Sequence, residues 1–458
     1  MSEPNNLTVI VGGGIAGLAT AYRLKQARPE WPVVVLERDP DPGGKVRSSM
    51  EGGYTVDWGP NGFLTNVQET LDLAHDLGLQ DDLVPAADVA KERYLYHDHA
   101  LRPLPTSPPK FLKSDLLSWR GKLRTALELF TPRRGPEPET VHAFLRRHFG
   151  REFANTFAGP FVLGITAGDA RQLSLDAMFP RLRALEKEHG SLVRGMVAQQ
   201  RHAKKDETRP KTRLTSFRAG GIGKLIGALQ QTLRDDLRTG VTVTAVTPEG
   251  DGYRVETADG EIFLAARVVL ATPAPVSGGV LEPFLPHVAK ELNAIPYADV
   301  RVIALGYDRV DVPHPLDGFG FLVSRGNNLR ILGVLFTSSI FPDQAPAGKV
   351  ALRVIAGGSL DPGFTALSDD DALAVVRHEL NISLGITADP EMVRQIDWPQ
   401  GIPQYLLGHR ERVTRIMDGL AEHPRVQLTG NSYYGVGVND CVRDAERVVA
   451  ALTGEQSG

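Results

Sequence analysis

The chain has 458 residues, of which 42% are hydrophobic and 23% charged, and its formal net charge is −4. This length predicts more than one domain, and the composition is typical of a soluble globular protein. The small negative charge argues against nucleic acid as a partner.

The single cysteine, Cys441, excludes an internal disulfide and fits a reducing compartment. Residues 1–6 are polar and acidic, so they predict no signal peptide. No apolar run in the sequence approaches the roughly 20 residues that a membrane-spanning helix needs. We therefore expect a cytoplasmic protein.

Residues 9–37 have the pattern of a dinucleotide-binding unit. A β-branched run at 9–11 is followed by a glycine turn, a helical stretch at 18–27, a second strand at 33–36 and an acid. In such a unit the glycines let the backbone turn and approach a pyrophosphate. The helix N-terminus favours negative charge, and the acid binds an adenosine ribose. The predicted contacts are Gly12, Gly13, Gly14, Ile15, Ala16, Gly17, Glu37 and Arg38.

A second glycine pair, Gly43-Gly44, follows soon afterwards, and residues 57–62 add Asp-Trp-Gly-Pro-Asn-Gly. Such turns let backbone pass close to the far half of a long cofactor. This order of motifs resembles the large family of FAD proteins that includes amine oxidases, phytoene desaturases and porphyrinogen oxidases. An NAD-dependent dehydrogenase with an unrelated glycine pair is the alternative.

The next segments predict a helix near 67–79 and a β-hairpin at 93–105. Its tip, His97-Asp98-His99, is better explained as a solvated turn than as a metal site, because no third ligand lies nearby in the sequence. Residues 91–134 hold ten Lys or Arg and four Asp or Glu, an excess of six positive charges that is typical of a region receiving an anion.

Helical patterns continue at 141–157, and the apolar, glycine-spaced residues 159–169 suit either the wall of a flat pocket or ordinary core. The polar residues 199–213 predict a mobile surface loop. Residues 218–225 are similar to a phosphate-binding loop but lack its Ser or Thr and its first glycine. They are better explained as the start of a helix that ends at Leu233.

Strands are expected at 241–246, 253–257, 262–264 and 268–270, forming an antiparallel sheet, and at 300–307, 318–324, 329–335 and 350–356, forming a broad sheet. A helix is expected at 369–384. The last segment predicts a strand at 426–429, a glycine turn and a helix near Asp440, which offer a second set of backbone N–H groups to a cofactor.

These patterns predict an α/β protein with a discontinuous Rossmann-type FAD-binding domain, a mixed-sheet substrate domain and a helical domain. We expect the FAD-binding domain at residues 1–85, 211–290 and 400–458. The substrate domain is expected at 86–105 and 291–399, and the helical domain at 106–210.

Several longer stretches are similar to the flavin-dependent porphyrinogen oxidases of haem synthesis, namely residues 93–96, 164–180, 318–324, 402–409 and 429–441. The resemblance implies non-covalent FAD and no metal. Beyond the first unit it implies cofactor contacts at Gly44, Lys45, Gly59, Pro60, Asn61, Val243, Gly430, Val438, Asn439 and Asp440. It implies substrate contacts at Arg93, Leu163, Gly164 and Phe321, with Arg102 as a less certain second cation.

The resemblance also implies hydride transfer from a tetrapyrrole substrate to the flavin, with molecular oxygen as acceptor and hydrogen peroxide as product, and it implies no catalytic acid or base. Coproporphyrinogen III is the favoured substrate and protoporphyrinogen IX the alternative. An oxidase of amines or carotenoid precursors, or a non-enzymatic binding protein on this scaffold, is less well supported. Peripheral membrane contact is not favoured, and a homodimer stays open. His409 and Cys441 are expected to be structural.

Overall fold

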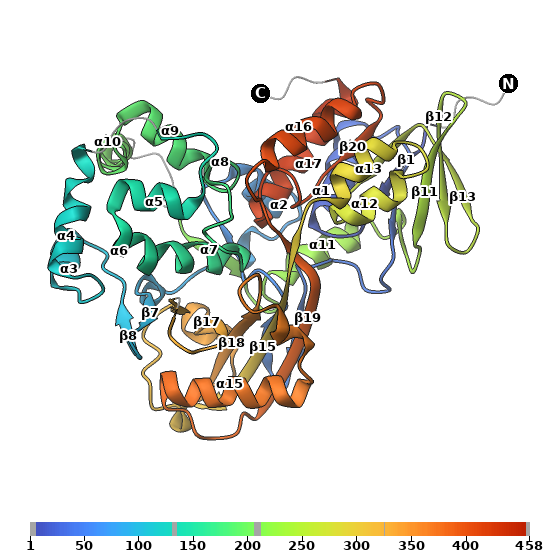
Figure 1. The fold of residues 1–458 in the computed structure, drawn as a ribbon. Coiled ribbons are helices and arrows are strands. Elements are labelled where there is room, and N and C mark those ends of the chain that lie inside the picture. The colour runs from blue at the N-terminus through green and yellow to red at the C-terminus, as the bar shows by residue number, and fades with distance from the viewer. Residues whose placement is uncertain (1–5, 131–134, 206–211, 325, 455–458) are drawn as a thin grey trace.

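The computed structural model describes residues 6–130, 135–205, 212–324 and 326–454. The described chain forms three regions, visible in Figure 1 as a helical region, a Rossmann-type layer structure and a large mixed sheet between and below them. No helix among these residues is long and apolar enough to cross a membrane.

The Rossmann-type region is built on a five-stranded parallel sheet whose central strand is buried on both faces, whereas the edge strand at Leu237–Thr239 is largely exposed. Its order is β10 (Leu237–Thr239), β2 (Val33–Glu37), β1 (Thr8–Val11), β14 (Arg267–Leu270) and β20 (Val426–Leu428). Ile10 packs into the core on one face, whereas Val9 and Val11 pack into the core on the other. This burial explains why β1 reads as a continuous apolar run.

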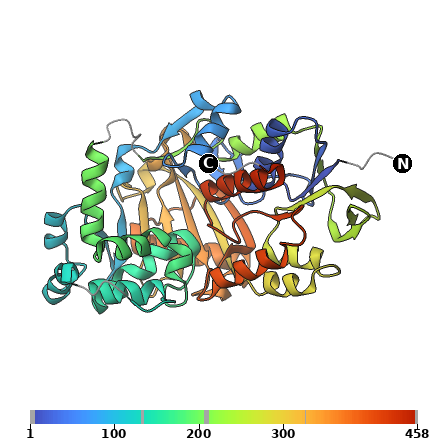
Figure 2. The same ribbon diagram turned by 90° about the horizontal axis from the view of Figure 1, so that it is seen from above.

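Helices cover one face of this sheet. They are α1 (Ile15–Ala27), α2 (Gln68–Asp76), α11 (Gly223–Thr232) and α17 (Val438–Thr453). The other face is covered by an antiparallel sheet of β11 (Val243–Glu249), β12 (Gly252–Thr257) and β13 (Ile262–Ala265), with α12 (Ala274–Leu281), α13 (Pro286–Asn293) and α16 (His409–Gly419). Figure 2 shows α17, from the end of the chain, beside the amino-terminal segment.

The large sheet has seven strands. Its order is β19 (Met392–Pro403), β15 (Tyr297–Asp308), β18 (Lys349–Gly357), β17 (Ile331–Leu335), β16 (Gly320–Val323), β7 (Tyr94–His97) and β8 (Ala100–Pro103). All neighbours are antiparallel except β16 and β7. The helix α15 (Asp369–Leu384) packs on one face through an apolar core. The opposite face meets the helical region and the segment around Trp58.

The helical region contains α3 (Pro108–Lys113), α4 (Trp119–Ala126), α5 (Val141–Phe149), α6 (Arg151–Phe153), a π-helical turn (Ala154–Ala158), α7 (Gly159–Thr166), α8 (Leu175–Met178), α9 (Pro180–His189) and α10 (Leu192–Lys205). Smaller elements join the regions: β3 (Ser48–Glu51) with β4 (Tyr54–Asp57), β5 (Phe63–Leu64) and β6 (Leu83–Pro85) with β9 (Leu214–Phe217), and α14 (Thr337–Ile340).

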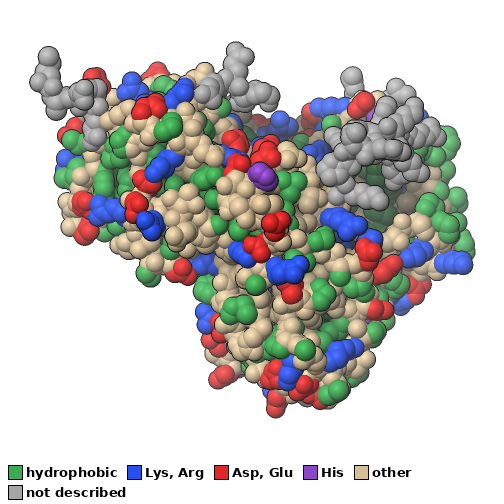
Figure 3. Space-filling view, turned by 180° about the vertical axis from the view of Figure 1, so that it is seen from behind, with side chains coloured by type: hydrophobic (Ala, Val, Ile, Leu, Met, Phe, Trp, Pro, Cys, Tyr) green, Lys and Arg blue, Asp and Glu red, His purple; other side chains and the backbone are tan. Residues whose placement is uncertain are grey.

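Two expectations about elements were wrong. Residues 199–205 belong to α10 rather than to a loop, because Gln, Arg, Ala and Lys are good helix formers despite their polarity; residues 206–211 lie outside the described chain. The strand β14 joins the parallel sheet beside β1 and is not part of the antiparallel one. Side chains of both charge signs are interspersed over the rear face of the molecule (Figure 3).

Candidate cofactor and substrate site

The glycine turn lies at the carboxyl end of β1, in the middle of the parallel sheet. Gly12 has φ +107°, and a Cβ there would lie 2.9 Å from the carbonyl oxygen of Ala271. A Cβ on Gly17 would overlap the carbonyl of Gly12, so only glycine allows α1 to begin so close to the strand. Gly14 caps α1 without a side-chain hydrogen bond, which leaves the first helical N–H groups for an anion.

Glu37 ends β2 directly beside this turn. Its Oε2 accepts a hydrogen bond from the Gly13 N–H at 2.5 Å, and its Oε1 accepts one from the Asp39 N–H at 2.7 Å. A carboxylate has about four acceptor sites, so capacity remains for ribose hydroxyls. The carbonyl of Glu37 accepts from the Val241 N–H, which places the start of β11, at Val243, nearby. Arg38 is exposed and lies 3.6 Å from Asp39.

Loops that are distant in the sequence meet at this turn. The Gly43 N–H donates to the carbonyl of Gly13 at 2.8 Å, and a Cβ on Gly44 would lie 3.3 Å from the Cα of Gly14. A Cβ on Gly59, which Pro60 and Asn61 follow, would overlap the carbonyl of Lys45.

The carboxyl-terminal turn reaches the same place. A Cβ on Gly430 would lie 3.9 Å from the Cβ of Ala16. Val438 and Cys441, in the first turn of α17, share a buried core with Ile15 and Ala16. Asp440 accepts from the Gly437 N–H at 3.0 Å and so fixes the start of this helix. The predicted cofactor residues from both ends of the chain therefore surround one site.

Unpartnered polar groups in this site fit a long, polar ligand. Asn61 Nδ2 and Asn439 Oδ1 are buried and have no hydrogen-bond partner among the described residues. The Asn439 Nδ2, by contrast, donates to the carbonyl of Leu64 at 2.8 Å. Burial lowers the pKa of Lys45, and no described carboxylate neutralises it. Buried polar groups normally have partners, so these residues fit the phosphates and ring edge of a flavin dinucleotide.

Arg93 precedes β7 and has no ion-pair partner among the described residues. Its guanidinium lies 4.8 Å from the ring centroid of Phe319. The side chain is solvent-accessible, yet desolvation by the surrounding protein lowers the pKa of Arg93, as expected at the wall of a hollow. Arg102 is instead paired with Asp115 and donates to the carbonyl of His97. Of the two predicted cations, Arg93 is the one available to an anion.

The face of the large sheet opposite α15 is the face that meets α7. Leu322 of β16 points to Gly164, where an added Cβ would lie 3.4 Å from its Cδ1, and Leu163 packs against Leu332. Phe321 was expected to line a substrate pocket, but its ring is only 3% exposed and packs in the core beneath α15. Because side chains alternate along a strand, Leu322 occupies the position expected of Phe321.

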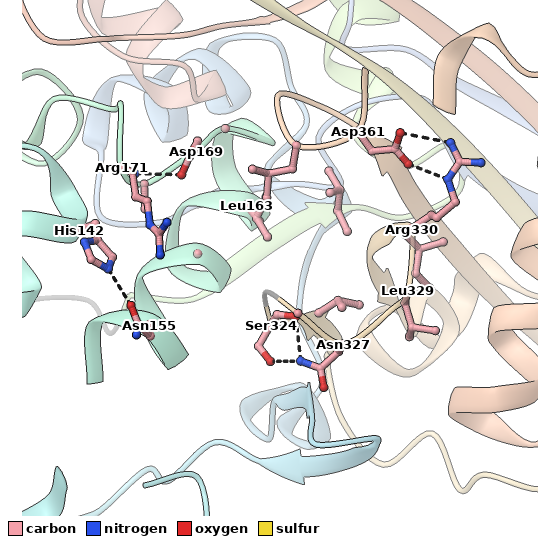
Figure 4. A pocket seen from close by; sticks show the side chains of 18 of the residues that line it. His142, Asn155, Leu163, Asp169, Arg171, Ser324, Asn327, Leu329, Arg330 and Asp361 are labelled. Carbon is pink, nitrogen blue, oxygen red and sulfur yellow. Dashed lines mark hydrogen bonds and ion pairs between the residues drawn. The ribbon is translucent and has the colours of Figure 1, made fainter. Parts of the chain in front are cut away.

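A cavity of about 350 Å³ lies beside Leu163, between the helical region and the connection from β16 to β17 (Figure 4). Its polar lining is mixed, with residues contributed by both regions. Among the described residues they are His142, Asn155, Asp169 and Arg171 from the helical side, and Ser324, Asn327, Asn328, Arg330 and Asp361 from the sheet side.

The remaining titratable candidates are structural. His409 stacks on Tyr405 with centroids 3.9 Å apart, and burial lowers its pKa to about 4. Burial raises the pKa of Cys441 to about 12, so its thiol stays protonated. The described residues contain no group of three or more His, Cys, Asp or Glu that could hold a metal ion.

One supporting residue was not predicted from the sequence. The hydroxyl of Tyr405 donates to the carbonyl of Asn431 at 2.7 Å and accepts from the Gly435 N–H at 3.0 Å. It therefore fixes the carboxyl-terminal turn from the large-sheet side. Tyr405 lies in residues 402–409, which were noted in the sequence only as a stretch similar to a known family, with no role predicted for Tyr405.

Residues 15–453 match the model of the flavin containing amine oxidoreductase family. The chain belongs to this family. It is a flavin-dependent oxidoreductase, which agrees with the site built above.

Relatives of known name extend over nearly the whole chain. It is 30% identical to coproporphyrinogen III oxidase of Bacillus subtilis over 99% of both chains. It is 31% identical to the chloroplastic protoporphyrinogen oxidase of rice over 95% of this chain and 86% of that protein. A crystal structure from Exiguobacterium sp. 255-15, provisionally named a protoporphyrinogen oxidase, has a TM-score of 0.85 at 28% identity, covering 98% of this chain and 99% of that one.

Proposed function

We propose that this protein oxidises a porphyrinogen to the porphyrin in haem biosynthesis, with non-covalently bound FAD, in the cytoplasm. The observation that supports this most is the placement of Leu163, Gly164 and Leu322. These side chains and the glycine backbone form an apolar wall. Leu322 pairs in register with Leu95, and Arg93 lies two residues before Leu95, so alternation along the strand puts this solvent-accessible cation, which has no ion-pair partner among the described residues, on the same sheet face. Such a wall with a cation suits a flat apolar ring that carries carboxylates.

In this proposal both ends of the chain hold the FAD. Glu37 binds the adenosine ribose, and the N-terminus of α1 and Lys45 face the pyrophosphate. The unpartnered Nδ2 of Asn61 and Oδ1 of Asn439 form hydrogen bonds with the cofactor. The other proposed contacts are Gly12, Gly13, Gly14, Ile15, Ala16, Gly17, Arg38, Gly44, Gly59, Pro60, Val243, Gly430, Val438 and Asp440. We also retain the three-domain division given above as a proposal.

The bound flavin supplies hydride acceptance and reoxidation by molecular oxygen. Three two-electron oxidations remove six hydrogens from a porphyrinogen and reduce three oxygen molecules to three hydrogen peroxide molecules. The chain itself binds and orients the ring: Arg93 pairs with a propionate, and Leu163, Gly164 and Leu322 hold the macrocycle. His409 remains neutral and buried, so it is not a proton donor in this scheme.

We favour coproporphyrinogen III, which carries four carboxylates, over protoporphyrinogen IX, which carries two. The excess of positive charge at residues 91–134 supports this choice. The names of the relatives support both substrates equally. Oxidation of an amine is less well supported, because Tyr433 is buried and Tyr434 exposed, so the two do not form a paired aromatic cage.

The proposal is tested by aerobic assay of the purified, flavin-loaded protein with each porphyrinogen. We expect porphyrin fluorescence to appear with three molecules of hydrogen peroxide per porphyrin. A yellow protein that produces neither porphyrin nor peroxide from either substrate, but oxidises amines, would contradict the proposal.

A further inference from the structure

Among the described residues, two arginines line the 350 Å³ cavity, and only one of them is engaged by a described carboxylate. Arg330 is held by Asp361 through two hydrogen bonds of 2.7 and 3.1 Å and lies over the ring of Phe364. Arg171 has an exposed side chain, and no partner for its guanidinium is recorded among the described residues. Arg330 is therefore part of the wall, whereas Arg171 is available to a ligand.

The backbone of Arg171 is nevertheless fixed. Its N–H donates to Asp169 Oδ1 at 3.0 Å, so the residue is anchored while its guanidinium extends from the loop (Figure 4). Asn155 lies on the same side of the cavity, and its Oδ1 is within 3.0 Å of His142 Nε2. That contact directs the Nδ2 of Asn155 away from His142, as a second donor beside Arg171.

The cavity and Arg93 lie at opposite ends of one strand. Arg93 contacts Phe319, immediately before β16, and the cavity is lined by Val323 and Ser324 at the other end of β16. At about 3.3 Å per residue, the five steps from Phe319 to Ser324 span roughly 17 Å. This distance is comparable to the width of a tetrapyrrole with its side chains, and Leu163 borders both the cavity and the apolar wall.

We propose that Arg171 is a specificity-determining residue that pairs with the propionates which coproporphyrinogen III carries where protoporphyrinogen IX carries vinyl groups. The inference rests on the proposed function and adds to it a reason for the substrate choice. Arg93 then pairs with the propionates common to both substrates. The planar guanidinium of Arg171 matches a carboxylate in a bidentate manner, whereas a vinyl group leaves it unpaired.

The test compares steady-state kinetics of Arg171→Gln and the wild type on both porphyrinogens. We expect KM for coproporphyrinogen III to rise about tenfold, the lower end for a hydrogen bond to a charged group. We expect kcat to stay unchanged and protoporphyrinogen IX kinetics to stay within about twofold. The matched control is Arg181→Gln, an exposed arginine of α9 in the same helical region that does not line the cavity and lies outside the basic stretch 91–134. It should alter neither KM.

Direct binding provides a second readout that does not depend on turnover. The protein is titrated with coproporphyrin III and with protoporphyrin IX, and binding is measured by fluorescence quenching. In Arg171→Gln we expect weaker binding of coproporphyrin III and unchanged binding of protoporphyrin IX. Two results would overturn the role of Arg171 in a variant with native flavin content and Tm. One is an equal loss of affinity for both ligands, and the other is no increase in KM for coproporphyrinogen III. A wild-type protein that oxidises neither porphyrinogen would instead contradict the proposed function itself.

Discussion

Arg93 carries the charge that substrate binding requires in our account, and its environment suits that role. The guanidinium is desolvated by its surroundings and has no ion-pair partner in the described part of the chain, so a carboxylate gains a charge-assisted bond there. We expect Arg93→Ala to raise KM for both porphyrinogens, because the variant loses about 1–3 kcal/mol of substrate-binding free energy. Steady-state kinetics measure the change. The control is Arg102→Ala on the same hairpin, whose partner is Asp115. Equal effects of the two substitutions would contradict the assignment.

Gly44 tests the cofactor site with a closely matched control. Gly44 and Gly52 have nearly the same backbone, with φ +56° and +58°, so alanine strains both. A Cβ on Gly44 would lie 3.3 Å from the Cα of Gly14, whereas a Cβ on Gly52 meets nothing within 4 Å. We expect Gly44→Ala to purify with less flavin, judged by the ratio of visible to protein absorbance. Gly52→Ala should keep the flavin content of the wild type. A full flavin complement in Gly44→Ala would show that the turn does not contact the cofactor.

At the residue scale, the cofactor motif could be predicted but the substrate wall only in part. Glycine turns have a local cause, since their backbone conformation admits few other residues. The choice between Phe321 and Leu322 depends on which face of β16 meets α7, and a shift of one residue reverses that face. Arg171 was not singled out, because nothing in the sequence indicates that its neighbours leave it unpaired.

Among the elements, the helical region is stabilised by a buried network of charges. Burial acts to raise the pKa of Glu128, but hydrogen bonds from His148, Ser191 and the N–H groups of Leu192 and Val193 hold it at about 2. A carboxylate whose folded pKa is depressed stabilises the fold above its ordinary pKa of 4.5, and that contribution is lost as the pH falls toward 2.

We therefore expect the Tm of the protein to fall between about pH 4.5 and pH 2, with Glu128 among the causes. Glu128→Gln should lower Tm at neutral pH and flatten this dependence, because the amide cannot titrate. Glu188→Gln on α9 is the control, since Glu188 is exposed. Calorimetry across this pH range is the measurement. Parallel Tm curves for Glu128→Gln and the wild type would refute the contribution of Glu128.

Element prediction succeeded where the ends of an element have local signals. The helix α15 has the predicted bounds because Ser368 Oγ caps it by accepting from the Asp371 N–H and Gly385 ends it at φ +72°. The strand β14 was assigned to the wrong sheet, because an apolar run does not reveal which strand it pairs with. The helices α12, α13 and α16 and the strand β19 were not predicted, and none of these three helices has a side-chain N-cap that would mark its start.

For the whole molecule, the sequence was sufficient to predict an α/β fold with a Rossmann-type region joined to a mixed sheet and helices. That prediction depended on motifs from both ends of the chain, and the buried core that Ala16 shares with Val438 and Cys441 places those motifs together. The identity of the substrate could not be predicted in the same way, because substrate choice depends on side chains from separate regions that meet only in the folded protein.

The most direct measurement of the central claim is anaerobic mixing of the flavin-loaded protein with coproporphyrinogen III, followed by the visible absorbance of the oxidised flavin. We predict that the band bleaches on mixing and returns when oxygen is admitted, with faster bleaching than protoporphyrinogen IX produces. A flavin band that persists with both porphyrinogens would contradict the account.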